Sequence, residues 1–262
     1  MSNLSHMASC WGVLRSRQRN RISLVLGTSF ILFLGITFAQ ERSSHLDQRS
    51  ALLDGNQPIT TINELRAPNS ARVAVEKARE AILKGKVPEA HKLLDRALKA
   101  FPTYAPALMI EGFVNAEEHN LALAEQNLNA AIKADPYYGL AYLLLAAIYN
   151  DTERYDDALP LLNRAMPLTR SFWLVYLELA NTEIGMGEYE TALRHIERAE
   201  APQPRNLPPN TRAMVHLLKA RAFMGIGNQI LAKPEFEAAI KAEPNGEFAH
   251  YSRSALAQLQ LP

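Results

Sequence analysis

The feature that most constrains how this chain can fold is an internal repeat with a period of 34 residues. Self-similarity at a fixed period of roughly 20–50 residues is typical of proteins built from stacked supersecondary units. Small residues recur at this interval in three columns, and a large apolar residue recurs in a fourth: Ala78, Gly112, Ala146 and Ala180; Ala90, Ala124, Ala158 and Ala192; Ala97, Ala131, Ala165 and Ala199; Leu94, Leu128, Leu162 and Ile196.

A fifth copy of the pattern follows after an interval of 40 residues instead of 34. The six extra residues fall in the stretch 201–210, which is rich in proline and asparagine and has the composition of a loop. Prolines close most copies, at Pro102, Pro136, Pro204 and Pro244, and Arg170 stands where one is missing. Because apolar residues between these prolines recur at helical spacing, each copy predicts two helices joined by a turn.

These columns resemble those of the tetratricopeptide repeat family, whose unit of about 34 residues is a helix–turn–helix. The family's small, small, aromatic, small and proline columns are matched one by one by Ala220, Ala232, Phe236, Ala239 and Pro244. The family's tryptophan column departs from the pattern and holds Ala74, Leu108, Tyr142, Tyr176 and His216.

The resemblance covers residues 71–246 and implies an all-α fold, a right-handed α-solenoid of five helix pairs with a C-terminal capping helix. The expected units are about 71–104, 105–138, 139–172, 173–206 and 213–246, and the cap is 247–261, within a repeat domain of residues 71–262. Close packing explains the columns, since a small residue on each helix lets the two backbones approach. A proline then ends the second helix at a fixed length.

The N-terminal part has a different character. Residues 1–21 carry Arg15, Arg17, Arg19 and Arg21 and no acidic residue, and residues 22–39 carry no charge at all. As a helix these eighteen residues would rise ~27 Å, just enough to cross a bilayer core of ~30 Å. The arginines are expected to stay in the cytoplasm, which sends everything after Ala39 across the membrane.

Two interpretations of this segment remain open. Residues 22–39 are a transmembrane helix, which makes the protein a single-pass cell-membrane protein with an extracytoplasmic, periplasmic repeat domain. Alternatively they belong to a signal peptide that is cleaved near Ala39, which gives a secreted or periplasmic protein.

Residues 40–70 are expected to form a linker between this segment and the repeats. They carry Ser43, Ser44, Gly55, Pro58 and Pro68 and no sustained apolar period, apart from a short piece around 59–65 that is expected to be ordered. Asn69 and Ser70 are good N-cap residues for the first repeat helix.

Composition and motifs argue against catalysis. A formal net charge of +1 gives no basic excess for nucleic acid, and the single cysteine, Cys10, excludes an intrachain disulfide and a multi-thiolate metal site. His195 and Glu197 have the H-x-E spacing of zinc deaminases, but the P-C-x-x-C pair is absent. The glycine pairs Gly185/Gly187 and Gly225/Gly227 fall at predicted helix–helix turns. We therefore expect no enzyme activity, no cofactor, no metal and no small-molecule substrate.

The resemblance also implies where a partner binds, because ligands in this family usually lie on the concave side, against the first helix of each unit. The corresponding candidates for partner binding are Arg79, Met109, Phe113, Leu143, Asn150, Leu177, Asn181, Ile184 and Arg221. This mostly apolar strip suits an amphipathic helix or an extended apolar peptide. Arg79 and Arg221 lie several units apart, which disfavours a clamp for a terminal carboxylate. An alternative is that the next unit, or the linker folding back, buries the strip.

The sequence thus predicts a non-catalytic scaffold that is tethered to a membrane or exported and that holds a protein or peptide partner in an extracytoplasmic assembly. Two alternatives remain: an accessory subunit packed permanently into a large membrane complex, and an organelle receptor for targeting peptides. The residues do not identify the partner.

Overall fold

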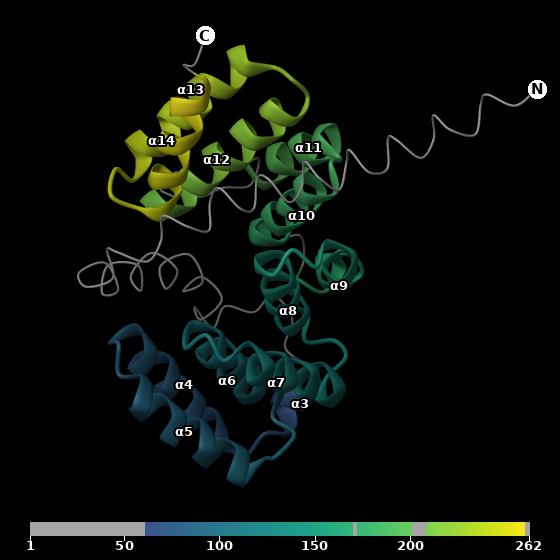
Figure 1. Cartoon of the computed structure of the whole chain (residues 1–262). Helices are drawn as coiled ribbons and strands as arrows, with labels where there is room; N and C mark the ends of the chain where they lie inside the picture. The colour runs from purple at the N-terminus through teal and green to yellow at the C-terminus, as the bar shows by residue number, and fades with distance from the viewer. Residues whose placement is uncertain (1–60, 170–171, 201–207, 260–262) are drawn as a thin grey trace, which may run out of the picture. The chain divides into compact units, whose positions relative to one another are not determined.

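The computed structural model describes residues 61–169, 172–200 and 208–259. The chain divides into two compact units, Met1–Glu41 and Arg42–Pro262, and all the described residues belong to the second. Every regular element in these ranges is a helix (Figure 1): α3 Ile62–Arg66, α4 Asn69–Leu83, α5 Val87–Ala100, α6 Ala105–Glu117, α7 Leu121–Ala134, α8 Gly139–Asp151, α9 Tyr155–Leu168, α10 Trp173–Met186, α11 Tyr189–Glu200, α12 Pro209–Gly225, α13 Gln229–Ala242 and α14 Glu247–Leu259. The predicted all-helical repeat fold is therefore confirmed.

The helices pack as consecutive pairs, and α14 closes the last one. We call α4, α6, α8, α10 and α12 the first helices and α5, α7, α9, α11 and α13 the second helices, because each first helix packs most extensively on the second helix that follows it. Each pair also packs on the next pair along the chain (Figure 1). Short turns join the two members of a pair, so they run antiparallel.

The four columns seen in the sequence occupy equivalent places. Ala90, Ala124, Ala158, Ala192 and Ala232 all lie on second helices, and each has an exposed fraction of 0%. At Gly112 of α6 the approach is closer still, since an added Cβ would lie 2.7 Å from Cγ of Leu128 on α7. Small residues are therefore required where the two helices of a pair cross.

The turns within the pairs repeat with the same period. In all five, one residue near the end of the first helix adopts a positive φ: Gly85 (70°), His119 (63°), Glu153 (58°), Gly187 (85°) and Gly227 (80°). Glycine reaches this left-handed region at little cost, whereas His119 and Glu153 do so against steric resistance.

Prolines behave in two ways. Pro102, Pro136 and Pro244 follow the ends of α5, α7 and α13, as predicted. In contrast, Pro160 and Pro167 lie inside α9 and Pro234 lies inside α13, so these second helices continue through a residue that lacks the backbone N–H. Pro204 and Arg170 lie outside the described residues.

The start of the repeats differs from the prediction in one detail. Asn69 and Ser70 do not cap the first repeat helix, because α4 already begins at Asn69 and its N-cap is Pro68, which makes no side-chain capping bond. The N-cap side chain is instead found on α3, where Thr61 and Glu64 form a reciprocal capping box.

The helix α3 anchors the end of the expected linker to the second pair. The side chain of Asn63 accepts a hydrogen bond from the backbone N–H of Ala105 (3.0 Å) and donates one to the carbonyl of Thr103 (2.8 Å). Asn63 therefore caps the first turn of α6 from outside that helix.

The expected basic tail 1–21, the apolar segment 22–39 and the linker up to residue 60 lie outside the described residues. None of the helices from α3 to α14 is both long and apolar enough to span a bilayer.

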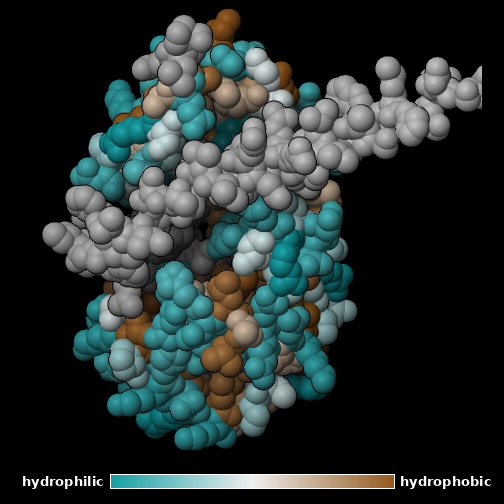
Figure 2. All heavy atoms as spheres, viewed as in Figure 1, coloured by the Kyte–Doolittle hydropathy of each residue, from teal (hydrophilic) through white to brown (hydrophobic). Residues whose placement is uncertain are grey.

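Burial differs between the two helix types. Each second helix buries three residues, which lie on one face, whereas α6, α8 and α10 bury ten residues each. On the face seen in Figure 2, hydrophilic residues cover most of the surface, and hydrophobic ones gather in a band over α6 and α7.

Candidate functional site

We call the side of the first helices that carries the nine predicted partner-binding residues the first-helix face. Its five apolar members are buried in the structure. The exposed fraction is 0% for Met109, Phe113 and Leu177, 1% for Leu143 and 7% for Ile184. All five belong to one continuous hydrophobic core. In this conformation their side chains are not accessible to a partner, so binding there requires the face to open.

The polar members of the face bond to one another across neighbouring pairs. Asn150 on α8 donates to a carboxylate oxygen of Glu178 (2.9 Å) and to its backbone carbonyl (3.1 Å), both on α10. The hydroxyl of Thr182 in turn donates to the amide oxygen of Asn150 (2.8 Å). All three residues are buried, and their network therefore fixes the third pair against the fourth.

This network also settles one reading of the local sequence. Asn150 and Thr152 form an N-glycosylation sequon. Since the Asn150 amide is 4% exposed and is already engaged with Glu178 and Thr182, the folded domain does not present it to a glycosylating enzyme.

The two predicted arginines lie at separate places. Arg221 on α12 donates to the side-chain oxygen of Asn181 on α10 at 2.9 Å, which joins the fourth and fifth pairs. Arg79 on α4 is 6% exposed, with its Nε 3.7 Å from a carboxylate oxygen of Glu76. Because these cations lie on α4 and α12, they do not converge on one carboxylate.

Arg79 lies in an electrostatic environment shared with two buried tyrosines. Burial raises the pKa of Tyr104 to about 12, with the Glu64 carboxylate adding to this rise and Arg79 opposing it. Burial likewise raises the pKa of Tyr138, again against the influence of Arg79. Both phenols therefore stay neutral at physiological pH.

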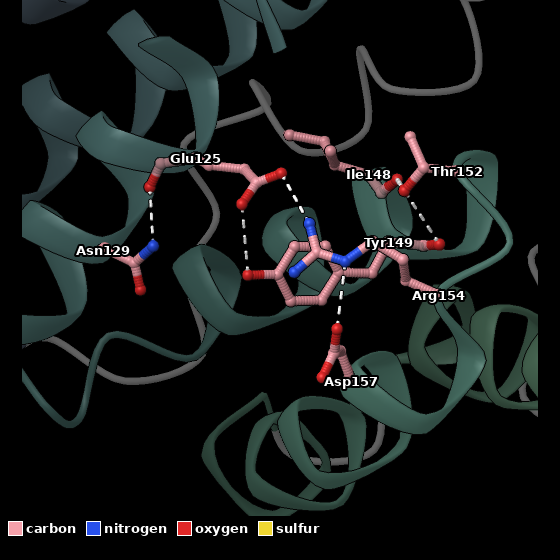
Figure 3. A network of polar contacts seen from close by, with 7 residues as sticks. All are labelled: Glu125, Asn129, Ile148, Tyr149, Thr152, Arg154 and Asp157. Atoms are coloured by element: carbon pink, nitrogen blue, oxygen red, sulfur yellow. Dashed lines mark hydrogen bonds and ion pairs between the residues drawn. The ribbon is translucent and has the colours of Figure 1, made fainter. Parts of the chain in front are cut away.

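A polar network on the surface was not anticipated from the sequence. Figure 3 shows Arg154, in the turn after α8, between two carboxylates: its Nη1 lies 2.8 Å from Glu125 of α7 and its Nε 3.0 Å from Asp157 of α9. The guanidinium also lies 3.9 Å from the centre of the Tyr149 ring. Arg154 thus links the second and third pairs, and the clustered carboxylates of this turn serve structure.

Three histidine–glutamate pairs were also missed. His91 of α5 lies 2.7 Å from Glu111 of α6. His195 of α11 lies 2.8 Å from Glu183 of α10. His216 of α12 lies 2.7 Å from Glu235 of α13. Each pair joins two helices, and helical periodicity gave no signal for them because it reports only apolar faces.

The first of these pairs has perturbed protonation. Burial by itself lowers the pKa of His91, but the carboxylates of Glu111 and Glu118 outweigh this effect and raise the pKa above its ordinary value of 6.5. Burial raises the pKa of Glu111, although His91 opposes the change.

The glycine pairs serve turns and packing. Gly187 and Gly227 supply the positive φ described above. An added Cβ at Gly185 would collide with the ring of Tyr155, and one at Gly225 would collide with the ring of Tyr189. Within the described ranges, no group of three or more His, Cys, Asp or Glu side chains is placed to hold a metal ion.

Comparison with protein families gives one match. Residues 75–139 and 116–170 match the family model described as "Tetratricopeptide repeat". Among curated proteins, none matches the chain significantly in sequence.

Solved structures resemble the fold of the chain. MamA 41-end from Desulfovibrio magneticus RS-1 is 15% identical, with a TM-score of 0.54 over 69% of this chain and 99% of that one. TTC0263, a thermophilic TPR protein of Thermus thermophilus, is 18% identical, with a TM-score of 0.57 over 71% and 99%. YrrB, described as a TPR protein with an unusual peptide-binding site, is 17% identical, with a TM-score of 0.52 over 72% and 99%. At these identities the likeness supports the tetratricopeptide-like fold and nothing finer.

Proposed function

We propose that this chain is a non-catalytic tetratricopeptide-type scaffold that holds a protein or peptide partner. The observation that carries the proposal is the layer of first helices, which presents a continuous apolar surface with a few amide and guanidinium groups. A layer of this chemistry suits an amphipathic helix or an extended apolar peptide. The match of residues 75–170 to the repeat family supports this function class.

The polar side chains of the last pairs are the most accessible part of the first-helix face. Asn181 and Arg221 are partly exposed, and the hydrogen bond between them is within reach of a ligand. An amide and a guanidinium can together bind the carbonyl groups of a peptide backbone. This places the first contact with a partner on α10 and α12.

We further propose that the scaffold works outside the cytoplasm, held at the membrane or released from it. The support is the sequence before the repeats, with its arginine-rich start and its uncharged stretch 22–39. A tether of this kind raises the local concentration of the scaffold at the membrane.

The site is tested by crosslinking the full chain in its native host and identifying the attached protein. The double substitution Asn181→Ala and Arg221→Ala is expected to reduce the crosslinked species by at least about tenfold, since two charge-assisted or amide hydrogen bonds are lost. Glu197→Ala with Arg198→Ala, on the exposed side of α11, is the matched control. Capture that is unaffected by the first pair, or that is lost equally with the control, contradicts the proposed site.

The setting is tested separately. Membranes washed with carbonate are expected to retain the full-length chain if residues 22–39 span the bilayer. A soluble species beginning at Gln40 instead identifies a cleaved signal peptide. A chain found with its repeats in the cytoplasm contradicts both forms of this proposal.

One observation favours a second function, that of a permanent accessory subunit. Four apolar side chains at the turns of the last two pairs are exposed: Met186 (38%), Ile226 (39%), Ile230 (87%) and Leu231 (45%). A fixed partner would bury them. Co-purification with a partner at constant stoichiometry through high salt distinguishes this function from reversible binding.

A further inference from the structure

The burial of the first helices is more complete than their described neighbours explain. The helices packed extensively against α8 are α7 and α9, in the second-helix layer, and α6 and α10, in its own layer. Apart from the terminal helices α3 and α14, all extensive helix packing in the described ranges lies within the first-helix layer, or between it and the second helices. Yet Phe113 and Leu177 are 0% exposed and Leu143 is 1% exposed.

A helix that is hydrophobic all round is stable in water only when every side is covered. The second-helix layer and the neighbouring first helices cover α8 from below and on its flanks. The remaining side, the first-helix face, needs an apolar cover of its own, because leaving several large side chains in contact with water costs about 1.5–3 kcal/mol for each.

The chain itself leads to this face. Thr61 caps α3, and Asn63 attaches α3 to the start of α6 through its bonds to Thr103 and Ala105. The residues before Thr61 therefore join the repeats beside a first helix. The compact unit that contains all the described residues begins at Arg42, well before α3.

The segment 42–60 has the length and the composition for such a cover. Its nineteen residues span at most ~68 Å when extended, whereas five first helices spaced by ~8–10 Å extend over only ~40 Å. Leu46, Leu52, Leu53 and Ile59 supply apolar side chains, and Asp47 and Asp54 supply carboxylates on a segment that faces a layer holding Arg79 and Arg221.

We propose that residues 42–60 bind along the first-helix face of the same chain, with their leucines over the apolar side chains of α6, α8 and α10. The segment is thus an internal ligand that occupies the partner site and leaves when a partner displaces it. This inference rests on the proposed function of the face as a binding site. It assigns to the expected linker a second role, that of a competitor present at high effective concentration.

The test uses the full-length chain and a matched pair of double variants. Leu52→Ser with Leu53→Ser removes the apolar anchors of the segment. Ile62→Ser with Leu65→Ser removes two equally large side chains from the neighbouring α3, where they are 68% and 69% exposed, and serves as the control. Hydrogen exchange is measured by mass spectrometry on peptides from α6, α8 and α10.

Exchange in these helices is expected to rise at least about tenfold in the first double variant and to stay unchanged in the control, since only the first loses its cover. A synthetic peptide of residues 42–60 is expected to bind the first variant at least about tenfold more tightly than the wild-type chain, where the tethered copy competes with it.

Three results overturn the inference: equal exchange in wild type and variant, equal rises in both variants, or equal peptide affinity for wild type and variant. A concentration-dependent dimer whose dissociation exposes the first helices also overturns it, because a second copy is then the cover. If the peptide fails to bind while the crosslinked partner still maps to α10 and α12, the proposed function stands and only this inference fails.

Discussion

The first and second helices of each pair have similar lengths but are buried in different ways. In the third pair, α9 buries only Ala158, Leu162 and Ala165, which follow one another at helical spacing. Its partner α8 buries ten of its thirteen residues, so that no single face of α8 is distinguished. The amphipathic helix announces its buried side in the sequence, whereas the helix that is apolar all round does not.

The difference teaches where the interior of a helical repeat lies. The second helices form an outer layer with charged residues on the solvent side, and the first helices are the core as well as the expected binding layer. Substitutions that distinguish the two layers are therefore the most direct checks.

The largest effect is expected in the first-helix layer. Phe113→Ala in α6 leaves a cavity at a fully buried position and is expected to lower the free energy of unfolding by about 3–5 kcal/mol. Leu123→Ala, at a side chain of α7 that is 50% exposed, is the control and is expected to change it by less than about 0.5 kcal/mol. Urea denaturation measures both, and equal values would erase the contrast between the layers.

A smaller effect is expected where the layers meet. Ala158→Leu inserts three carbons into the crossing of α8 and α9 and is expected to cost about 1–3 kcal/mol through overpacking. Ala122→Leu on the exposed side of α7 is the matched control. Thermal unfolding followed by circular dichroism compares them, and an unchanged melting curve for Ala158→Leu would mean that this column does not lie between helices.

The turn between the layers gives a gain in place of a loss. Glu153 has a positive φ of 58° at the place where Gly85, Gly187 and Gly227 stand in other pairs. Glu153→Gly removes the steric cost of this conformation and is expected to stabilise the fold by up to about 1 kcal/mol. Glu190→Gly, inside α11, is expected to destabilise it by a similar amount, so that a loss in both variants would contradict the turn geometry.

The weakest expected effect concerns a contact that joins a second helix to the next first helix. Because Glu111 and Glu118 raise the pKa of His91 in the folded state, the protonated histidine stabilises the fold below pH 6.5. This contribution is lost as the pH rises through the folded pKa, somewhat above 6.5.

His91→Gln is expected to flatten this part of the pH dependence of stability, between pH ~6 and ~8. His250→Gln on α14 is the comparison, measured by urea denaturation at a series of pH values. A wild-type chain whose stability rises over this interval for reasons that His91→Gln does not remove would contradict the assignment.

Much of the fold was readable in advance because its determinants are local and repeated. The columns of Ala90, Ala97 and Leu94 recur because every pair crosses at the same place, and one crossing predicts the rest. The N-cap expected at Asn69 and Ser70 was wrong, since Pro68 ends the preceding segment and Asn69 is already helical. A capping signal depends on where the chain enters a helix, and the residues alone did not fix that point.

The candidate site was predicted less well. Sequence placed the nine residues of the first-helix face on the right helices, and the structure then showed five of them inside the core. Asn150 was recognised as informative, but its partners Glu178 and Thr182 were not, because they lie 28 and 32 residues away on the next first helix.

The sequence by itself determined the period, the helix pairs and the small residues at their crossings, since close packing within one pair repeats the same requirement every 34 residues. Only the tertiary structure decided which side of the first helices is covered and which polar groups meet there. A helix with apolar residues on every side carries no directional signal, and hydrogen bonds between pairs join side chains as far apart as Asn181 and Arg221, whose meeting depends on how the pairs stack.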